Sequence, residues 1–492
     1  MVKFKVFKNG KLLNNLDLVG AYLFGSDGIA VRKAQISFNE GTVYCKKSTL
    51  QTAGLALLWT VDGFGKIMLP TTALPERERP YILNVELARA KLMQIMNKRE
   101  EWALFSDDNR LAGVFKQAQD LFINAIQNLS DELKAAKLAD EALQKAVIVA
   151  EDMANVHADV LFEARSKSRG FGRGCLGCII DPKQTNNSQY LKSFLSLSGF
   201  ATLPINWASI EKQKGNYDFS SIDDCIKILS QKRMLIGAGP LLCFSKKHLP
   251  QWLVKSKSGF EKVREAAYRF VSKTVSRYSG TVRAWRVISS LNAFNHFNFS
   301  FEEVLEMTRA ANMAVKAEGD RALKIVDISN PWGEYYASVP NTISPFVYVD
   351  MIVQGGINFD VFGLQIRVGK DLSGMLVRDM LQISAMLDLF ALIGKPVHIT
   401  EVEVPSKKAD TKKDSRDAGI WHQDWDESVQ AEWIKHFYKI VLSKPFIDTI
   451  TYSHLTDNEE NTIHNSGLLT KELKPKKSFE VLKKLRASIH DG

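Results

Sequence analysis

The sequence has 492 residues, of which 45% are hydrophobic and 24% are charged, and its formal net charge is +10. A chain of this length exceeds the size at which a single core stops growing, so two or three domains are expected. The composition is that of a soluble globular protein, and no run approaches eighteen uninterrupted apolar residues, which excludes a membrane span.

The N-terminus and the cysteines predict the compartment. The opening residues, 1–10, alternate charged and apolar side chains and contain no apolar stretch typical of a signal peptide. Five cysteines are too few, and odd in number, for a disulfide framework, which agrees with a reducing compartment. We therefore expect a cytoplasmic protein with no membrane partner.

Two features invite a metal or a nucleic-acid interpretation. Cys175 and Cys178 form a C-L-G-C pair, but they lack a second pair or a nearby His at ligand spacing, so an apolar pair on a strand is favoured. The lysines are spread along the chain, with modest clusters at 407–413 and 471–477, and no nucleic-acid motif accompanies them. We expect no metal, no other cofactor and no nucleic-acid partner.

Residues 1–80 are predicted to form a small β-sandwich-like domain. Short apolar runs are separated by turn residues, and these runs are 3–7, 18–24, 34–38, 42–45 and 55–61. The punctuated segment 74–81 is expected to be the linker that ends the domain.

Residues 81–168 change to a helical pattern rich in Ala, Leu, Glu and Lys, with breaks near 107–109 and 128–130. Asp131 and Glu132 suit the first turn of a helix that runs on to Arg165. The apolar positions of this region favour packing against a neighbouring domain, and a homo-oligomer formed through the N-terminal domain and these helices is an alternative.

The remainder, 169–492, alternates short β-branched runs with longer helical ones. The predicted strands are 175–181, 199–206, 234–242, 282–289, 323–329, 360–366, 397–404 and 447–455. Eight strands with helices between them predict an α/β fold of the (β/α)₈ TIM-barrel type. The basic, glycine-rich loop 165–174 lacks the G-x-G-x-x-G pattern, so it is interpreted as the entry to the barrel and not as a phosphate cradle.

Active sites of such barrels lie at the C-terminal ends of the strands, so polar residues there are the candidates. Three strand ends carry them, with the sequences W-R-V-I-S-S (285–290), G-L-Q-I-R (363–367) and H-I-T-E-V-E-V-P (398–405).

The last of these strand ends resembles the nucleophile strand of the family ten glycoside hydrolases, the β-1,4-xylanases. Three more segments match that family, and they are W-A-S-I-E-K-Q-K-G-N-Y-D-F (207–219), L-P-Q-W-L (249–253) and G-L-L-T-K-E-L-K-P-K-K-S-F (467–479). The resemblance covers about 175–482. The N-terminal sandwich and helices, with residues 72–89, resemble an extension carried by one branch of the family.

The resemblance implies retaining hydrolysis, in which two carboxyl groups roughly 5 to 5.5 Å apart act as nucleophile and as acid/base. Glu401 matches the nucleophile. The strand-four motif W-D-V-x-N-E is read here as Trp285, Arg286, Val287, Ile288, Ser289 and Ser290. Ser290 therefore occupies the acid/base position, and its hydroxyl is not competent as a proton donor.

Other positions depart from the family in the same direction. The strand-two motif E-N-x-M-K-W becomes T-L-P-I-N-W at 202–207, and G-H-x-L-V-W becomes A-G-P-L-L-C at 238–243. On strand six Gln365 is kept, but Arg367 stands where the family has His. Loss of the donor together with these sugar-binding groups predicts a barrel without its original chemistry.

Several residues are candidates for binding a sugar at the same mouth. They are Gln365, Arg367, Ser289, Trp332, Tyr335 and His454. Trp332 and Tyr335 could stack on a sugar face or anchor their loop. Glu401 competes as a working nucleophile and as a carboxylate held by Arg286 or Arg367, and Glu403, on the same strand face, could position it or form an ion pair.

Three functions remain open. The first is an impaired family-ten-like barrel that keeps a cleft for an oligosaccharide or polysaccharide. The second is an active retaining glycosidase that uses Glu401 and a displaced acid, for which His296, Glu302, Glu303, Asp457 and Glu459 are candidates. The third is an assembly protein in which the barrel is a scaffold, since fold alone does not fix function.

Overall fold

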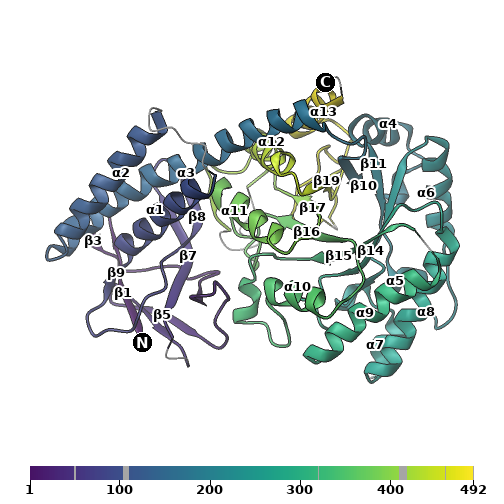
Figure 1. Ribbon diagram of the computed structural model, residues 1–492, viewed down its shortest axis with the longest axis horizontal. Helices are drawn as coiled ribbons and strands as arrows, with labels where there is room; N and C mark the ends of the chain where they lie inside the picture. The colour runs from purple at the N-terminus through teal and green to yellow at the C-terminus, as the bar shows by residue number, and fades with distance from the viewer. Residues whose placement is uncertain are drawn as a thin grey trace.

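The structure is a computed structural model, and it describes residues 1–48, 51–102, 110–256, 258–319, 321–408, 418–459 and 461–490. Figure 1 shows two parts side by side: small β-sheets near the N-terminus and a barrel formed by the C-terminal two thirds of the chain.

Eight parallel strands close into the barrel, which confirms the predicted fold class. They are β10 (Leu176–Ile179), β11 (Phe200–Leu203), β12 (Leu235–Ala238), β14 (Ala284–Ser289), β15 (Leu323–Ile328), β16 (Val361–Arg367), β17 (Val397–Glu403) and β19 (Ile447–Tyr452). Their order is β12-β11-β10-β19-β17-β16-β15-β14, and a pairing of β12 with β14 closes the ring. The third predicted strand is divided, because β12 ends at Ala238 and Leu242–Cys243 forms a separate strand, β13, beside β14.

A helix follows each barrel strand and covers the outside. These helices are α4 (Ser188–Leu197), α6 (Ser220–Gln231), α8 (Phe260–Tyr278), α9 (Phe301–Ala317), α10 (Pro345–Gln354), α11 (Met380–Ala391), α12 (Glu427–Ser443) and α13 (Lys477–His490). Two short helices, α5 (Trp207–Ile210) and α7 (Gln251–Lys255), lie in the loops. In α8 the buried side chains recur every three or four residues, from Val263 through Phe270 to Tyr278, which is the pattern of a helix packed on a sheet.

The N-terminal part contains two four-stranded sheets and a short hairpin, β2 (Phe7–Lys8) with β3 (Lys11–Leu12). One sheet has the order β5-β6-β1-β9, with β5 (Gln35–Asn39), β6 (Thr42–Lys46), β1 (Val2–Lys5) and β9 (Tyr81–Ile82). The other has the order β18-β8-β7-β4, with β18 (Ile420–Trp421), β8 (Gly65–Pro70), β7 (Ala53–Val61) and β4 (Tyr22–Gly25). Strand β18 belongs to the connection between β17 and α12, so the barrel supplies an edge strand to the N-terminal sheet, beyond the boundary expected at residue 80.

Three helices join the two parts: α1 (Leu83–Trp102), α2 (Arg110–Gln127) and α3 (Glu132–Ser168). Asp131 caps α3 by accepting from the backbone N–H of Lys134, while the expected break at 107–109 lies outside the described residues. Figure 1 shows α3 running from the sheets to the barrel. Buried Glu151 of α3 accepts hydrogen bonds from the indole of Trp421 at 2.9 Å and from the backbone N–H of Met380 at 2.7 Å, so the helix is fastened to the barrel.

None of the helices within the described residues is both long enough and apolar enough to cross a membrane.

Candidate functional site

Glu401 lies near the C-terminal end of β17, and both of its carboxylate oxygens are engaged by arginines. Oε1 accepts a hydrogen bond from Nη2 of Arg286 on β14 at 2.6 Å, and Oε2 accepts one from Nη2 of Arg367 at the end of β16. Its side chain is 13% exposed. Burial raises the pKa of Glu401, but the two guanidinium groups outweigh burial and bring that pKa to about 2. The carboxylate is therefore ionised and already has a donor on each oxygen.

Arg286 also binds a second, fully buried carboxylate, that of Asp327 on β15. Nε and Nη2 of Arg286 lie 3.2 and 2.5 Å from Oδ2 of Asp327. The same oxygen accepts from Ser289 at 2.7 Å and from Gln365 at 2.6 Å, and Oδ1 accepts from Thr400. Sequence reasoning did not select Asp327, although an acidic residue within the apolar run I-V-D-I of a barrel strand is the signal that marks it.

Ser289 and Ser290 are both buried at the end of β14. Their hydroxyl oxygens are 3.0 Å apart, and Ser289 is in turn bonded to Asp327 and Gln365. Ser290 has a φ of 62°, a left-handed conformation that few non-glycine residues adopt. The serine pair is therefore part of the buried hydrogen-bond network, next to the carboxylate of Asp327.

Arg367 joins Glu401 to a third carboxylate, that of Glu403. Nε of Arg367 donates to Oε1 of Glu403 at 3.1 Å, and the backbone N–H of Ile463 donates to Oε2 at 2.9 Å. Nε2 of His454, on the loop after β19, lies 3.7 Å from Oε1 of Glu403. Burial raises the pKa of Glu403, but His454, Arg367 and the backbone N–H of Ile463 together lower it below the ordinary value. Of the two roles expected for Glu403, the geometry gives it an ion pair with the arginine that holds Glu401.

The two aromatic candidates after β15 lie in different surroundings. Tyr335 is 3% exposed, and its hydroxyl donates to the backbone carbonyl of Ile343 at 2.7 Å and accepts from the side-chain amide of Asn292 at 2.5 Å. Trp332 is half-buried, and the guanidinium of Arg378 lies 4.2 Å from its ring centroid. Tyr335 is thus placed as a loop anchor, because a buried ring has no face to offer a sugar.

A cleft of about 480 Å³, with both apolar and polar lining residues, lies over the C-terminal ends of β10, β11 and β19. It includes His454, and so it adjoins the charged network. Hydroxyl, amide and charged side chains dominate its polar lining, among them Asn206, Lys212, Asp218, Ser220, Ser453 and Asn461. A cleft with so many hydrogen-bonding groups suits a polyhydroxylated ligand.

Comparisons with known proteins agree with this architecture. The family model described as glycosyl hydrolase family 10 matches residues 172–484. The chain belongs to glycosyl hydrolase family 10. Crystal structures with the same fold include the native xylanase 10B of Thermotoga maritima, with a TM-score of 0.50 and 17% identity over 65% of this chain and 97% of that one. A psychrophilic family 10 endo-β-1,4-xylanase has a TM-score of 0.50 at 15% identity, over 66% of this chain and 98% of that one.

The chain matches only part of the length of its curated relatives. The chain is 23% identical over 240 residues to an Arabidopsis thaliana protein named endo-1,4-β-xylanase 5-like, covering 47% of this chain and 40% of the relative. It is 21% identical over 324 residues to endo-1,4-β-xylanase 2 of the same plant, covering 64% of this chain and 28% of the relative. It therefore spans less than half of either relative.

Family 10 membership allows each departure to be set against the geometry. By the motif resemblance, Arg286 is expected at the Asp of the strand-four motif and Arg367 at the His of strand six, and these two residues supply the guanidinium groups that hold Glu401. The same resemblance puts Ser289 and Ser290 at the Asn and the acid/base Glu of the strand-four motif. The substitutions thus form one connected network in the structure.

The candidates for a displaced acid have other partners or lie exposed. Glu303 forms the capping box of α9 with Ser300, and Glu302 accepts from the hydroxyl of Ser300 at 3.0 Å. Asp457 pairs with Lys476 at 2.7 Å, and Glu459 pairs with Lys471 at 3.0 Å. His296 is exposed, with its ring against Phe297.

Proposed function

We propose that this family 10 barrel binds a β-linked oligosaccharide or polysaccharide at its C-terminal mouth but no longer cleaves it by the route of the family. The observation that carries the proposal is the double engagement of Glu401 by Arg286 and Arg367, beside a serine pair where the proton donor belongs.

The acid half of the reaction lacks a donor of suitable acidity. A serine hydroxyl does not protonate a leaving alcohol near neutral pH, and a general acid contributes about 10²- to 10⁴-fold in rate. The two carboxylates that share arginines with Glu401 are those of Asp327 and Glu403, whose side chains are 0% and 1% exposed. Neither can face a sugar in an open cleft at the roughly 5 to 5.5 Å separation that retaining hydrolysis requires.

The nucleophile half is weakened as well. To attack an anomeric carbon, Glu401 must turn an oxygen lone pair toward the sugar, and both oxygens already accept charge-assisted hydrogen bonds from arginine. Such bonds are about twice as strong as neutral ones. The low pKa of Glu401 reflects the same attraction and makes the carboxylate a poorer nucleophile.

The cleft beside His454 supports the binding half of the proposal. Its hydroxyl and amide groups can bond sugar hydroxyls, and it adjoins the network through His454, which lies 3.7 Å from Glu403. The family's named relatives are endo-β-1,4-xylanases, so xylo-oligosaccharides and the related cello-oligosaccharides are the first ligands to test.

Isothermal titration with xylohexaose and cellohexaose tests binding. Lys212→Ala, within the cleft, is expected to weaken binding, whereas Lys214→Ala is the matched control, since Lys214 lies over the ring of Trp252 and not in the cleft. No binding of either series would contradict the proposal.

Hydrolysis assays test the loss of cleavage. A dinitrophenyl β-xylobioside needs little acid assistance, so release of dinitrophenol that disappears in Glu401→Gln would reveal a working nucleophile. Xylan cleavage that requires Glu401 would replace the proposal with an active glycosidase.

A further inference from the structure

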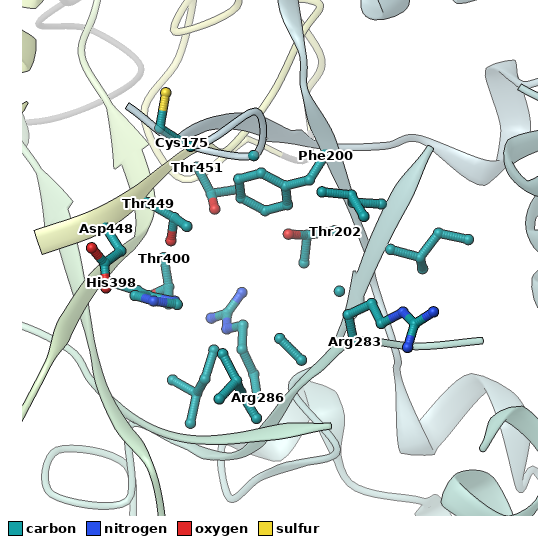
Figure 2. Close-up of a pocket in the computed structure, with 18 of the residues that line it drawn as sticks. Cys175, Phe200, Thr202, Arg283, Arg286, His398, Thr400, Asp448, Thr449 and Thr451 are labelled. Atoms are coloured by element: carbon teal, nitrogen blue, oxygen red, sulfur yellow. The ribbon is translucent and has the colours of Figure 1, made fainter. Parts of the chain in front are cut away.

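The N-terminal half of the barrel interior is a chamber, at the opposite end from Glu401. Its volume is about 490 Å³, within the range of about 300 to 1,000 Å³ typical of small-molecule sites. The lining residues include the first residue of four barrel strands, Phe200, Leu235, Ala284 and Leu323, and the loop that leads into β10. Figure 2 shows this space with the side chains arranged around it.

The chamber exists because small side chains occupy positions that point into the barrel. Barrels of this type are ordinarily filled by layers of bulky branched residues. Here Gly237, Ala284, Thr202, Thr449 and Thr451 line the space instead. A Cβ added at Gly237 would meet nothing closer than the carbonyl oxygen of Ala284, at 3.5 Å, so even this glycine is not enforced by crowding.

The wall has two chemically different arcs. Apolar side chains come from β11, β12 and β15, namely Phe200, Leu235, Ile236, Leu323 and Ile325. Hydroxyl groups face them from β17 and β19, on Thr400, Thr449 and Thr451, and one more hydroxyl, that of Thr202 on β11, lies on the apolar side. Figure 2 shows Thr400 and Thr449 across the chamber from Thr202.

Three of these hydroxyls are not used by the protein. Within the described part of the chain, no hydrogen bond involves the hydroxyls of Thr202, Thr449 or Thr451, although Thr202 and Thr451 are each only 4% exposed. None of these three hydroxyl oxygens is among the fully buried side-chain atoms that lack a partner in the described residues, so they are accessible from the chamber and available to bond a ligand. His398 adds an imidazole to the same arc, and burial lowers its pKa to about 4, so its ring is neutral.

Three arginines, Arg165, Arg169 and Arg283, lie at the N-terminal opening of the chamber, which we call the entrance, whereas Arg286 lies at its inner end, which we call the floor. Arg169 pairs with Asp448 at 2.5 Å, and Arg165 donates to the backbone carbonyls of Leu442, Lys444 and Ile447. Arg283 is exposed at the edge of the chamber, where Figure 2 shows its side chain directed away from the centre, and no described residue forms an ion pair with it.

At the floor, the charge of Arg286 is already matched by two carboxylates, those of Asp327 and Glu401. An anion is therefore favoured at the entrance and disfavoured at the floor.

We propose that this chamber binds an amphiphilic carboxylate: an apolar ring body between the two arcs, a hydroxyl group bonded to the threonines, and the carboxylate beside Arg283 at the entrance. This site lies outside the cleft described above and does not depend on the fate of glycoside cleavage.

Fluorescence titration of the full chain with three matched probes tests the proposal. The probes are a hydroxynaphthoate with its two substituents at opposite ends of the rings, the naphthoate without the hydroxyl, and the naphthol without the carboxylate. We expect one saturable site, tightest for the hydroxynaphthoate, and no displacement by xylohexaose. Absence of saturable binding for all three probes would overturn the proposal.

Single variants assign each part of the ligand. Arg283→Gln is expected to weaken both naphthoates about two- to fivefold and to leave the naphthol unchanged, the range of an exposed ion pair. Arg110→Gln, an exposed arginine at the start of α2, is the matched control. Thr451→Val keeps the side-chain shape and is expected to weaken only the two hydroxyl-bearing probes, by about three- to tenfold.

Filling the chamber gives the decisive result. Ala284→Leu is expected to abolish binding of all three probes. Gly237→Ala, which adds a methyl group without a clash, provides a milder change should the larger one impair folding. Unchanged binding in folded Ala284→Leu or Gly237→Ala protein would place the probes elsewhere and overturn the proposal.

Discussion

The two ends of the barrel interior differ in the residue types that line them. At the C-terminal end, Arg286, Asp327, Arg367, Glu401 and Glu403 form a continuous buried network of ion pairs. At the N-terminal end, glycine, alanine and threonine residues from β11, β12, β14 and β19 surround a chamber of about 490 Å³. Charge is concentrated where the family performs its chemistry, and space is left where such barrels are ordinarily filled.

Under the proposed function, the site is closed without removal of its charged residue. Glu401 is retained, and each of its carboxylate oxygens accepts a hydrogen bond from an arginine. Arg286 and Arg367 each pair with two carboxylates, so a change at one carboxylate affects the pairing of another. Substitutions at the network and at the chamber can therefore be compared.

The largest expected effect concerns catalysis at the C-terminal end. Ser290→Glu alone should produce no xylo-oligosaccharide hydrolysis, because Arg367 still holds Oε2 of Glu401. Combined with Arg367→His, the new carboxyl group is expected to raise hydrolysis of a phenyl xylobioside about 10²- to 10⁴-fold over Arg367→His alone. Product release measured by chromatography checks the gain.

The single variants serve as controls for each other. If Ser290→Glu alone restored turnover, the ion pair of Arg367 with Glu401 would not be what restrains the nucleophile. Titration with xylohexaose should accompany each assay, so that a loss of binding is not taken for a loss of chemistry.

The next effect is on stability, at the centre of the network. Asp327→Asn removes one of the two carboxylates that pair with buried Arg286, and breaking a buried pair in this way costs about 3 to 5 kcal/mol. Asp360→Asn is the matched control near the other end of the barrel, where Asp360 is 37% exposed and pairs with Lys324. There the cost should be about 1 kcal/mol or less. If urea denaturation gave the same loss of unfolding free energy for Asp327→Asn and Asp360→Asn, the buried network would contribute no more to stability than the exposed pair of Asp360 with Lys324.

Lowering the pH should remove the contribution of Glu401 to stability over a defined pH range. The pKa of Glu401 falls from 4.5 to about 2 on folding, so its contribution to stability is fully present above the unfolded-state value and is lost as the pH falls through the folded-state value. The shift corresponds to about 3 kcal/mol.

Glu401→Gln removes this contribution, so wild type and variant should differ most near neutral pH. The difference in unfolding free energy should narrow as the pH falls from about 5 toward about 2. Exposed Glu480→Gln on α13 is the baseline. A difference that stays constant with pH would mean that the arginines do not depress the pKa of Glu401.

The sequence was sufficient for the barrel because its eight strands are short β-branched runs between helical ones. Glu401 and Ser290 were selected as candidates by their motifs, and Arg286 and Arg367 by their departure from those motifs. Asp327 was missed because it contacts Arg286, Ser289, Gln365 and Thr400 across strands, a relation that no local pattern contains.

The N-terminal sheet and the chamber show the same limit. Strand β18, Ile420–Trp421, is two residues long and pairs with β8, so its partner is distant in sequence. The chamber depends on which small residues point inward at one level of the barrel, and this needs the register of all eight strands. Sequence periodicity predicts which face of a strand each residue lies on, but it does not predict the register of one strand against the next.

The smallest expected effect compares the same substitution at two threonines of the chamber wall, one of which bonds the charged network. Thr400 donates to buried Asp327, whereas the hydroxyl of Thr451 has no hydrogen-bond partner within the described residues. Thr400→Val leaves a buried acceptor short of a donor, at a cost of about 1 to 3 kcal/mol. Thr451→Val should change the unfolding free energy by less than about 0.5 kcal/mol, since it breaks no hydrogen bond within the protein. Urea denaturation of both variants measures the two changes in unfolding free energy. If Thr451→Val lowered the unfolding free energy by more than about 0.5 kcal/mol, the hydroxyl of Thr451 would already be hydrogen-bonded within the chamber. The chamber wall would then contain structural hydrogen bonds of its own.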